Sequence, residues 1–175
     1  MDVRSELLRE HSRRQMLLVA EHVDCDSKRF AELMALFFSG EYRVAQRSAG
    51  VVSTVVERHP KLIAPYFSRI VELLEDNTAG AAVHRNILRL LRHAPIPRSF
   101  EGRLYDICLT KLDDPKAAIA VRAFAMEVAV RIANGEVQLL DEVGLIVRKH
   151  MGNSSAALKA KARNLLKITA ENSEN

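Results

Sequence analysis

The stretch "DNTAGAAVHRNILRLLRHA", residues 76–94, joins a polar turn to an amphipathic helix, and it decides how the rest of the chain is interpreted. The segment from Asp76 to Gly80 is polar and ends in glycine, which is typical of a turn between two helices. After it, apolar side chains recur at the spacing of one helix face: Val83, Ile87, Leu90, Leu91 and Ala94. The opposite face carries Arg85, Arg89 and Arg92. The stretch therefore predicts a helix that buries one side and exposes a row of arginines.

The same combination of turn and helix is found along most of the chain. We expect an N-terminal helix at about residues 4–22 that covers the apolar end of the first helical pair. Four pairs should follow it: 28–38 with 42–58, 61–75 with 80–93, 99–112 with 116–133, and 136–150 with 154–169. Pro60 falls at a predicted helix start, and Pro65 lies one turn further in, where it should bend or restart that helix. Pro97 and Pro115 are expected at or just before helix starts.

Two kinds of marker repeat along these pairs with a shared period of 37 to 39 residues. An Asp or Asn ends the turn inside a pair at Asp76, Asp114 and Asn153. A basic residue lies in the first half of each second helix: Arg47, Arg85, Arg122 and Lys161. Because both series follow the helix breaks, they indicate an internal structural repeat rather than an ordinary helical bundle.

On these marks the chain resembles HEAT-repeat proteins, which are armadillo-type α-solenoids. The turn Asp or Asn, the basic residue eight or nine positions later and the proline near a first helix match that family over about residues 28–168. The resemblance implies an all-α fold, a right-handed α-α superhelix of about four HEAT-like hairpins plus the N-terminal helix. We expect a single domain over residues 1–170 and a disordered tail at 171–175. The first pair departs from the pattern, with Ser39 and Glu41 where Asp is expected, as an atypical end repeat would.

Composition limits the class of protein further. Apolar residues make up 48% of the 175-residue chain, which suffices for a continuous core, and only seven Gly and five Pro favour helices over a β-sandwich. The longest stretch without a charged residue or His runs from Ser48 to Val56, whereas a membrane helix needs about 20 apolar residues. The start, "MDVRSELLREHSRRQ", does not have the apolar segment of a signal peptide, so we expect a cytoplasmic protein. Two cysteines, Cys25 and Cys108, are too few for a disulfide framework, and Cys108 is expected to be buried.

Positive charge is concentrated on the expected second helices. Lys and Arg outnumber Asp and Glu on each of them by two to four residues, although the net charge of the whole chain is only +4. Because the second helices of a HEAT solenoid line its concave side, the resemblance implies a basic groove. Its candidate binding residues are Arg43, Arg47, Arg85, Arg89, Arg92, Arg131, Lys159, Arg163 and Lys167.

A groove of one charge sign favours a partner of the opposite sign. We therefore expect a non-enzymatic scaffold or adaptor that presents a basic concave surface to an acidic protein or peptide. Nucleic acid is the alternative partner, since phosphates would fit the same groove and some HEAT-like proteins repair alkylated DNA. The chain has no Trp and only three Tyr, which leaves few aromatic surfaces for an extruded base or a single strand. A structural interpretation also stands, in which the basic residues of the repeat pair with turn carboxylates, as in the ladder of the family.

Patterns that would indicate catalysis or metal binding are weak in this sequence. The segment "HVDCD" gathers His22, Asp24, Cys25 and Asp26, but no second ligand cluster completes a metal site, so we expect a solvated loop. The sequence has no G-x-S-x-G, phosphate-binding loop, H-E-x-x-H or C-x-x-C motif. We therefore expect no cofactor, no metal and no enzymatic activity. The identity of the partner and the oligomeric state stay open.

Overall fold

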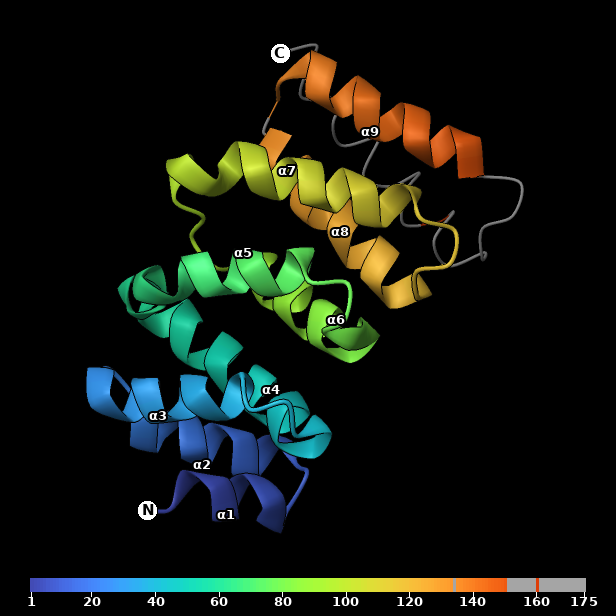
Figure 1. Cartoon of the computed structure of the whole chain (residues 1–175). Helices are drawn as coiled ribbons and strands as arrows, with labels where there is room; N and C mark the ends of the chain where they lie inside the picture. The colour runs from blue at the N-terminus through green and yellow to red at the C-terminus, as the bar shows by residue number, and fades with distance from the viewer. Residues whose placement is uncertain (134, 151–159, 161–175) are drawn as a thin grey trace. The chain divides into compact units, whose positions relative to one another are not determined.

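The computed structural model describes residues 1–133, 135–150 and 160, and every regular element in these residues is a helix (Figure 1). The chain divides into two compact units. Unit 1 is Met1–Ile96, and unit 2 comprises the described residues from Pro97 onward. Each unit is described by itself below, and a single domain over residues 1–170 stays a prediction. In the described residues, no helix is both long enough and apolar enough to cross a membrane.

Unit 1 is a series of antiparallel helices that pack on α4. Its elements are α1 (Val3–Arg9), α2 (Arg13–Val23), α3 (Ser27–Phe37), α4 (Tyr42–Arg58), the 3-10 helix η1 (Pro60–Tyr66), α5 (Phe67–Glu75) and α6 (Gly80–Leu91). Helix α4 contacts α1, α2, α3, η1 and α6, while α5 pairs with α6. The predicted pairs 28–38 with 42–58 and 61–75 with 80–93 are therefore present as hairpins, with only small differences at their ends.

The single N-terminal helix expected at 4–22 is wrong, because the chain breaks between α1 and α2. Ser12 is the N-cap of α2, and its hydroxyl accepts the N–H of Gln15 at 3.1 Å. Ser12 and Gln15 have the S-x-x-Q spacing of a capping box, which was the sequence signal for this break. Gln15 is buried and donates its amide to the backbone oxygen of Glu6 at 3.1 Å, which folds α2 back against α1. The two short helices still cover one end of the first hairpin, where Leu7 and Val19 are buried.

The prolines act mainly as the sequence predicts. Pro60 begins η1, and Pro65 lies where this 3-10 segment gives way to α5, so the predicted restart of the helix is confirmed. A proline there removes a backbone N–H that a continuous α-helix would need. Pro97 is the N-cap of α7. Pro115 is an exception, because α8 begins only at Ile119 and the residues between them form a turn.

Unit 2 contains α7 (Arg98–Asp113), α8 (Ile119–Ala133) and α9 (Val137–His150). Helix α7 packs along α8, and α9 contacts both of them. The Tyr105 hydroxyl of α7 donates to the backbone oxygen of Leu139 at 2.6 Å, which fixes the start of α9. Cys108 is fully buried as expected, and this burial raises the pKa of its thiol to about 12. The helix predicted at 154–169 lies outside the described residues, apart from Ala160.

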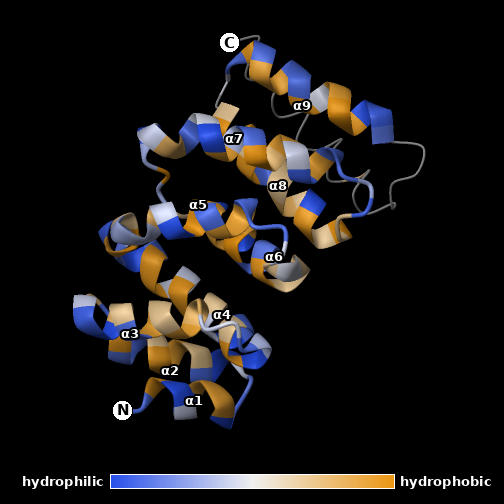
Figure 2. Cartoon of the chain, viewed as in Figure 1, coloured by the Kyte–Doolittle hydropathy of each residue, from blue (hydrophilic) through white to orange (hydrophobic). Residues whose placement is uncertain are grey.

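Figure 2 shows hydrophobic and hydrophilic residues alternating along the helices, and α6 buries the apolar stripe that the periodicity predicts. In α6 and just after it, Ile87, Leu90, Leu91 and Ala94 are at most 1% exposed, and Val83 is half-buried. Fully buried leucines of this kind contribute strongly to stability, since truncating one to Ala costs about 2–5 kcal/mol. The opposite stripe is polar, so the stacking of hairpins leaves charged side chains available on the surface.

Candidate functional site

A side-chain acceptor closes the turn in three hairpins that follow one another in the sequence. Ser39, Asp76 and Asp114 each accept the backbone N–H two residues further on, at 3.3, 2.8 and 2.8 Å. This local bond stabilises a turn without help from the rest of the fold. Ser39 therefore closes the turn of the first hairpin with the same type of hydrogen bond that Asp forms in the next two. The replacement of Asp by Ser in the sequence does not remove this turn bond.

Eight residues after Asp76 and Asp114, a buried side chain bonds the end of the helix before the turn. His84 contacts the backbone oxygen of Leu73 in α5, at 3.1 Å from Nε2. Arg122 donates from Nε to the backbone oxygen of Leu112 in α7 at 3.0 Å. Carbonyl groups in the last turn of a helix have no N–H partner within that helix, so a side-chain donor satisfies them. His84 and Arg122 are therefore structural residues, each 6–7% exposed.

The corresponding position in the first hairpin is Arg47, eight residues after Ser39. Its Nη1 donates to the backbone oxygen of Leu7 in the last turn of α1, at 2.8 Å. A cation at the C-terminal end of a helix is favoured by the helix dipole. The bond of Arg47 therefore joins α4 to α1. The bonds of His84 and Arg122, by contrast, lie within their own hairpins.

These contacts correct the ladder interpretation. Arg122 and Arg47 bind backbone carbonyl groups rather than turn carboxylates. The basic position of the repeat in α6 is His84, so the prediction of Arg85 was displaced by one residue. Lys161 lies outside the described residues. The physical reason is that the turn carboxylates of Asp76 and Asp114 already bond their own backbone, whereas carbonyl groups in the last turn of a helix have no N–H partner within it.

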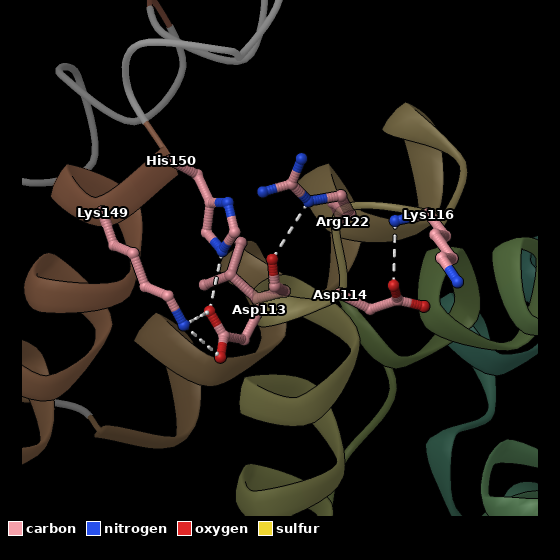
Figure 3. Close-up of polar contacts among 7 residues, drawn as sticks. Asp113, Asp114, Lys116, Arg122, Lys149 and His150 are labelled. Carbon is pink, nitrogen blue, oxygen red and sulfur yellow. Dashed lines mark hydrogen bonds and ion pairs between the residues drawn. The ribbon is translucent and has the colours of Figure 1, made fainter.

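Asp113, the last residue of α7, binds α9, whereas its neighbour Asp114 closes the turn (Figure 3). Its oxygens accept from Lys149 Nζ at 2.8 and 2.9 Å, and His150 Nε2 lies 2.7 Å from Oδ1. The hydrogen bond from Lys149, followed by that from His150, lowers the pKa of Asp113. Because a carboxylate only accepts hydrogen bonds, His150 must carry its proton on Nε2. This contact holds the end of α9 against the end of α7.

The predicted binding residues of unit 1 lie on α4 and α6. Arg43 and Arg47 are one turn apart on α4, and Arg85 and Arg89 are one turn apart on α6. Arg43 and Arg89 are exposed, while Arg47 and Arg85 are half-buried. Since α4 and α6 contact each other, the four guanidinium groups belong to one pair of neighbouring helices.

A cavity of about 200 Å³ opens between the α1–α2 elbow and these two helices. Among the predicted residues, Arg47 and Arg89 line it. The sequence analysis did not predict the lining residues Glu10, His11 and Arg13, because it treated the elbow as continuous helix. The remaining lining residues are Leu7, Ser12, Gln15, Met16, Gln46, Gly50 and Val51.

Glycine at position 50 lets α2 come close to α4 beside this cavity. A Cβ placed on Gly50 would lie 3.0 Å from the sulfur of Met16, which is tighter than ordinary van der Waals contact. The N-terminus of α2, with Ser12 as its cap, also borders the cavity. Three guanidinium groups against one carboxylate, that of Glu10, make the wall of this cavity electropositive.

The other predicted binding residues are placed differently or not at all. Arg92 is the half-buried C-cap of α6, and it makes further polar contacts. Arg131 is exposed in the last turn of α8, in unit 2. Lys159, Arg163 and Lys167 lie outside the described residues. The structure therefore places the four predicted arginines of α4 and α6 on neighbouring helices. The role of the other predicted residues in binding stays a prediction.

The "HVDCD" segment has a structural contact of its own. Asp24 has a positive φ of 43°, and its carboxylate lies 2.8 Å from His59 Nε2 at the end of α4. This hydrogen bond lowers the pKa of Asp24. Over the residues that the structure describes, no group of three or more His, Cys, Asp or Glu could hold a metal ion.

Comparison with known proteins adds the family. A family model described as the HEAT repeat domain matches residues 3–169. Neither the search of curated proteins nor the search of solved structures found a match. The match spans both units and includes the hairpins that repeat the turn acceptor and the buried donor eight residues later. This chain therefore belongs to the HEAT-repeat family of helical solenoid proteins.

Proposed function

We propose that this protein is a binding scaffold or adaptor that receives an acidic protein segment on the basic side chains of α4 and α6. Stacked helical hairpins present long ordered surfaces and are commonly used for protein interaction. The proposal assigns binding to unit 1 first, through Arg43, Arg85 and Arg89. Arg92, Arg131, Lys159, Arg163 and Lys167 stay predicted members of the same surface, and residence in the cytoplasm stays a prediction.

One observation carries the proposal: Arg47 and Arg89, which come from different hairpins, line the same electropositive cavity. Arginine side chains repel one another when they are brought together without an anion, so their convergence favours a negatively charged partner. Arg47 has a structural bond to Leu7, but Arg43, Arg85 and Arg89 make no such bond within the described part of the chain. Their guanidinium groups are thus available for a partner's carboxylates.

The proposal favours protein over nucleic acid because the surface offers few aromatic stacking partners. In unit 1, Tyr66 contacts Phe30 at a ring-centroid distance of 5.7 Å and belongs to the first-helix side. Tyr42 is exposed at the start of α4, beside Arg43. A single exposed tyrosine can contact a peptide or stack on a base. The test below therefore includes an oligonucleotide.

The test measures binding of a labelled octa-glutamate peptide, acetylated and amidated, by fluorescence anisotropy at low and at physiological salt. We expect binding that weakens with salt, since exposed charge contacts are screened. The double variant Arg43→Glu with Arg85→Glu should reduce the affinity by about tenfold or more, because it replaces attraction by repulsion. The matched control is Arg58→Glu with Arg148→Glu, which makes the same charge change at two exposed arginines that are not among the candidates.

Two results would contradict the proposal. In the first, the wild-type protein does not bind octa-glutamate, or the control variant loses as much affinity as the test variant. In the second, a single-stranded or double-stranded oligonucleotide of the same charge binds far more tightly than the peptide, which would assign the surface to nucleic acid.

A further inference from the structure

We infer that the cavity lined by Arg13, Arg47 and Arg89 is an anchor site that takes one glutamate side chain of the acidic partner. This inference rests on the proposed function and deepens it, because it names the residue of the partner and the place where that residue is held. The name "anchor cavity" is used below for this space of about 200 Å³.

Two arginines supply hydrogen-bond donors at the rim of the anchor cavity. Arg13 and Arg89 are exposed at the rim, and neither of them forms a hydrogen bond or ion pair with any residue that the structure describes. They approach from different elements, since Arg13 begins α2 and Arg89 lies in the last turn of α6. Two guanidinium groups from separate helices can bind both oxygens of one carboxylate, and each such charge-assisted bond is stronger than a neutral one.

The wall of the cavity also holds positive charge that is already in place for a ligand. Arg47 is held by its bond to the Leu7 carbonyl, so its positive charge stays in the wall with little conformational freedom. The N-terminus of α2 adds the positive end of an eleven-residue helix to the same wall. Preorganised positive groups of this kind attract an anion without a further entropic cost for ordering them, so only Arg13 and Arg89 need to be ordered by the ligand.

The lining of the cavity is mixed in character, and this selects the stem of the ligand. Met16, which is half-buried, lines the cavity beside the arginines, and the buried Leu7 and Val51 lie behind it. Two methylene groups of a glutamate can rest on Met16 while the carboxylate reaches the guanidinium groups of Arg13 and Arg89. Aspartate has one methylene fewer, so it would leave either the apolar contact or the arginine contact incomplete.

The remaining polar groups at the anchor cavity are compatible with this ligand. Glu10 is the acidic residue in the lining, and it limits the site to one carboxylate by repelling a second. His11 is exposed at the same elbow. Gln46 offers an amide N–H that can donate to a carboxylate oxygen.

The experiment compares arginines that line the anchor cavity with arginines that do not. Affinity for octa-glutamate is measured for Arg13→Gln with Arg89→Gln, and for the control Arg14→Gln with Arg58→Gln. Arg14 is adjacent to Arg13 on α2 and is also exposed, but it does not line the cavity. We expect about a tenfold loss for the lining pair and less than about a twofold loss for the control. Octa-aspartate has the same charge as octa-glutamate and should bind the wild-type protein several-fold more weakly. The variant with both lining arginines replaced should not show this preference for glutamate. Thermal melting of both variants confirms that each is folded.

Three outcomes would overturn the inference. Equal losses in the lining pair and the control would show that only total charge matters. An octa-glutamine peptide with a free terminal carboxylate that binds as well as octa-glutamate would assign the anchor cavity to a chain end. Unchanged binding in the lining pair, together with loss in the Arg43 and Arg85 charge reversal, would refute the anchor but leave the proposed function standing. The proposed function itself fails if the wild-type protein does not bind octa-glutamate.

Discussion

The α5–α6 hairpin of unit 1 and the α7–α8 hairpin of unit 2 use different residues to make the same contact. In the first, His84 binds the carbonyl groups of Leu73 and Asp76. In the second, Arg122 binds the carbonyl group of Leu112. The difference teaches that this repeat preserves a donor at a fixed distance after the turn, and that the chemical type of the donor can vary.

The two hairpins also differ in what surrounds the donor. Arg122 has a long, charged side chain that is only 7% exposed, so its bond to Leu112 lies in a poorly solvated place. His84 is similarly buried, but its ring has a shorter reach and shares one N–H between two carbonyls at 3.1 and 3.0 Å. Loss of the donor should therefore be more harmful in the α7–α8 hairpin, and the predictions below test that difference.

The largest effect is expected for Arg122→Met. Methionine fills part of the space but cannot donate, so the Leu112 carbonyl is left buried without its partner, at a cost of about 2–3 kcal/mol. Urea denaturation should show this loss in the free energy of unfolding. Arg148→Met, at an exposed position of α9, is the control and should change stability by less than about 0.5 kcal/mol. If both variants are equally stable, the bond of Arg122 does not hold the hairpin.

A smaller effect is expected for His84→Leu, about 1–2 kcal/mol, because a leucine of similar size keeps the packing but leaves two carbonyls without the imidazole donor. The variant His84→Arg tests the comparison directly, since it places the arginine donor of the α7–α8 hairpin in the α5–α6 hairpin. It should be more stable than His84→Leu by chemical denaturation. An Arg variant as unstable as the Leu variant would mean that the two positions are not equivalent.

Two helical glycines extend the comparison to the helices themselves. Gly102 in α7 has no atom within 4 Å of an added Cβ, so Gly102→Ala should raise the stability by about 0.5–1 kcal/mol through helix propensity alone. Gly50 in α4 has the Met16 sulfur at 3.0 Å, so Gly50→Ala should bring no gain and should alter the anchor cavity. Thermal melting of the two variants measures the contrast. If both variants gain the same stability, a Cβ at position 50 is tolerated, and the packing of α2 on α4 does not require glycine there.

The smallest effect concerns pH and the contact of Asp113 with α9. The bonds from Lys149 and His150 lower the pKa of Asp113, so their stabilisation is fully present above the ordinary Asp value of 3.8 and is lost as pH falls through the lower folded value. The carboxylate is 40% exposed, so the contribution is only about 0.5 kcal/mol. The amide protection factors at the end of α9, which are corrected for the intrinsic exchange rate at each pH, should fall below about pH 4 in the wild-type protein. Asp113→Asn should show the faster exchange already at neutral pH, and a wild-type-like profile in this variant would contradict the assignment.

Much of the fold could be predicted from the sequence, because turns and amphipathic helices depend on neighbouring residues. The polar breaks at Asp76 and Asp114 were placed correctly, and Pro65 correctly marked a restarted helix. The break before α2 was also signalled by the capping-box spacing of Ser12 and Gln15. The error over Arg85 had another origin, since residues 84 and 85 are both basic in type and only packing decides which one turns inward.

The sequence by itself determined that this chain is helical, that its hairpins repeat and that its second helices are basic, because propensity, periodicity and charge are properties of short stretches. Only the tertiary structure decided which basic residues are structural and which are available, since that depends on the position of carbonyl groups at the ends of other helices. It also decided the anchor cavity, whose lining comes from residues as far apart in sequence as Arg13 and Arg89. Such a site forms only where separate helices meet, and no local pattern specifies it.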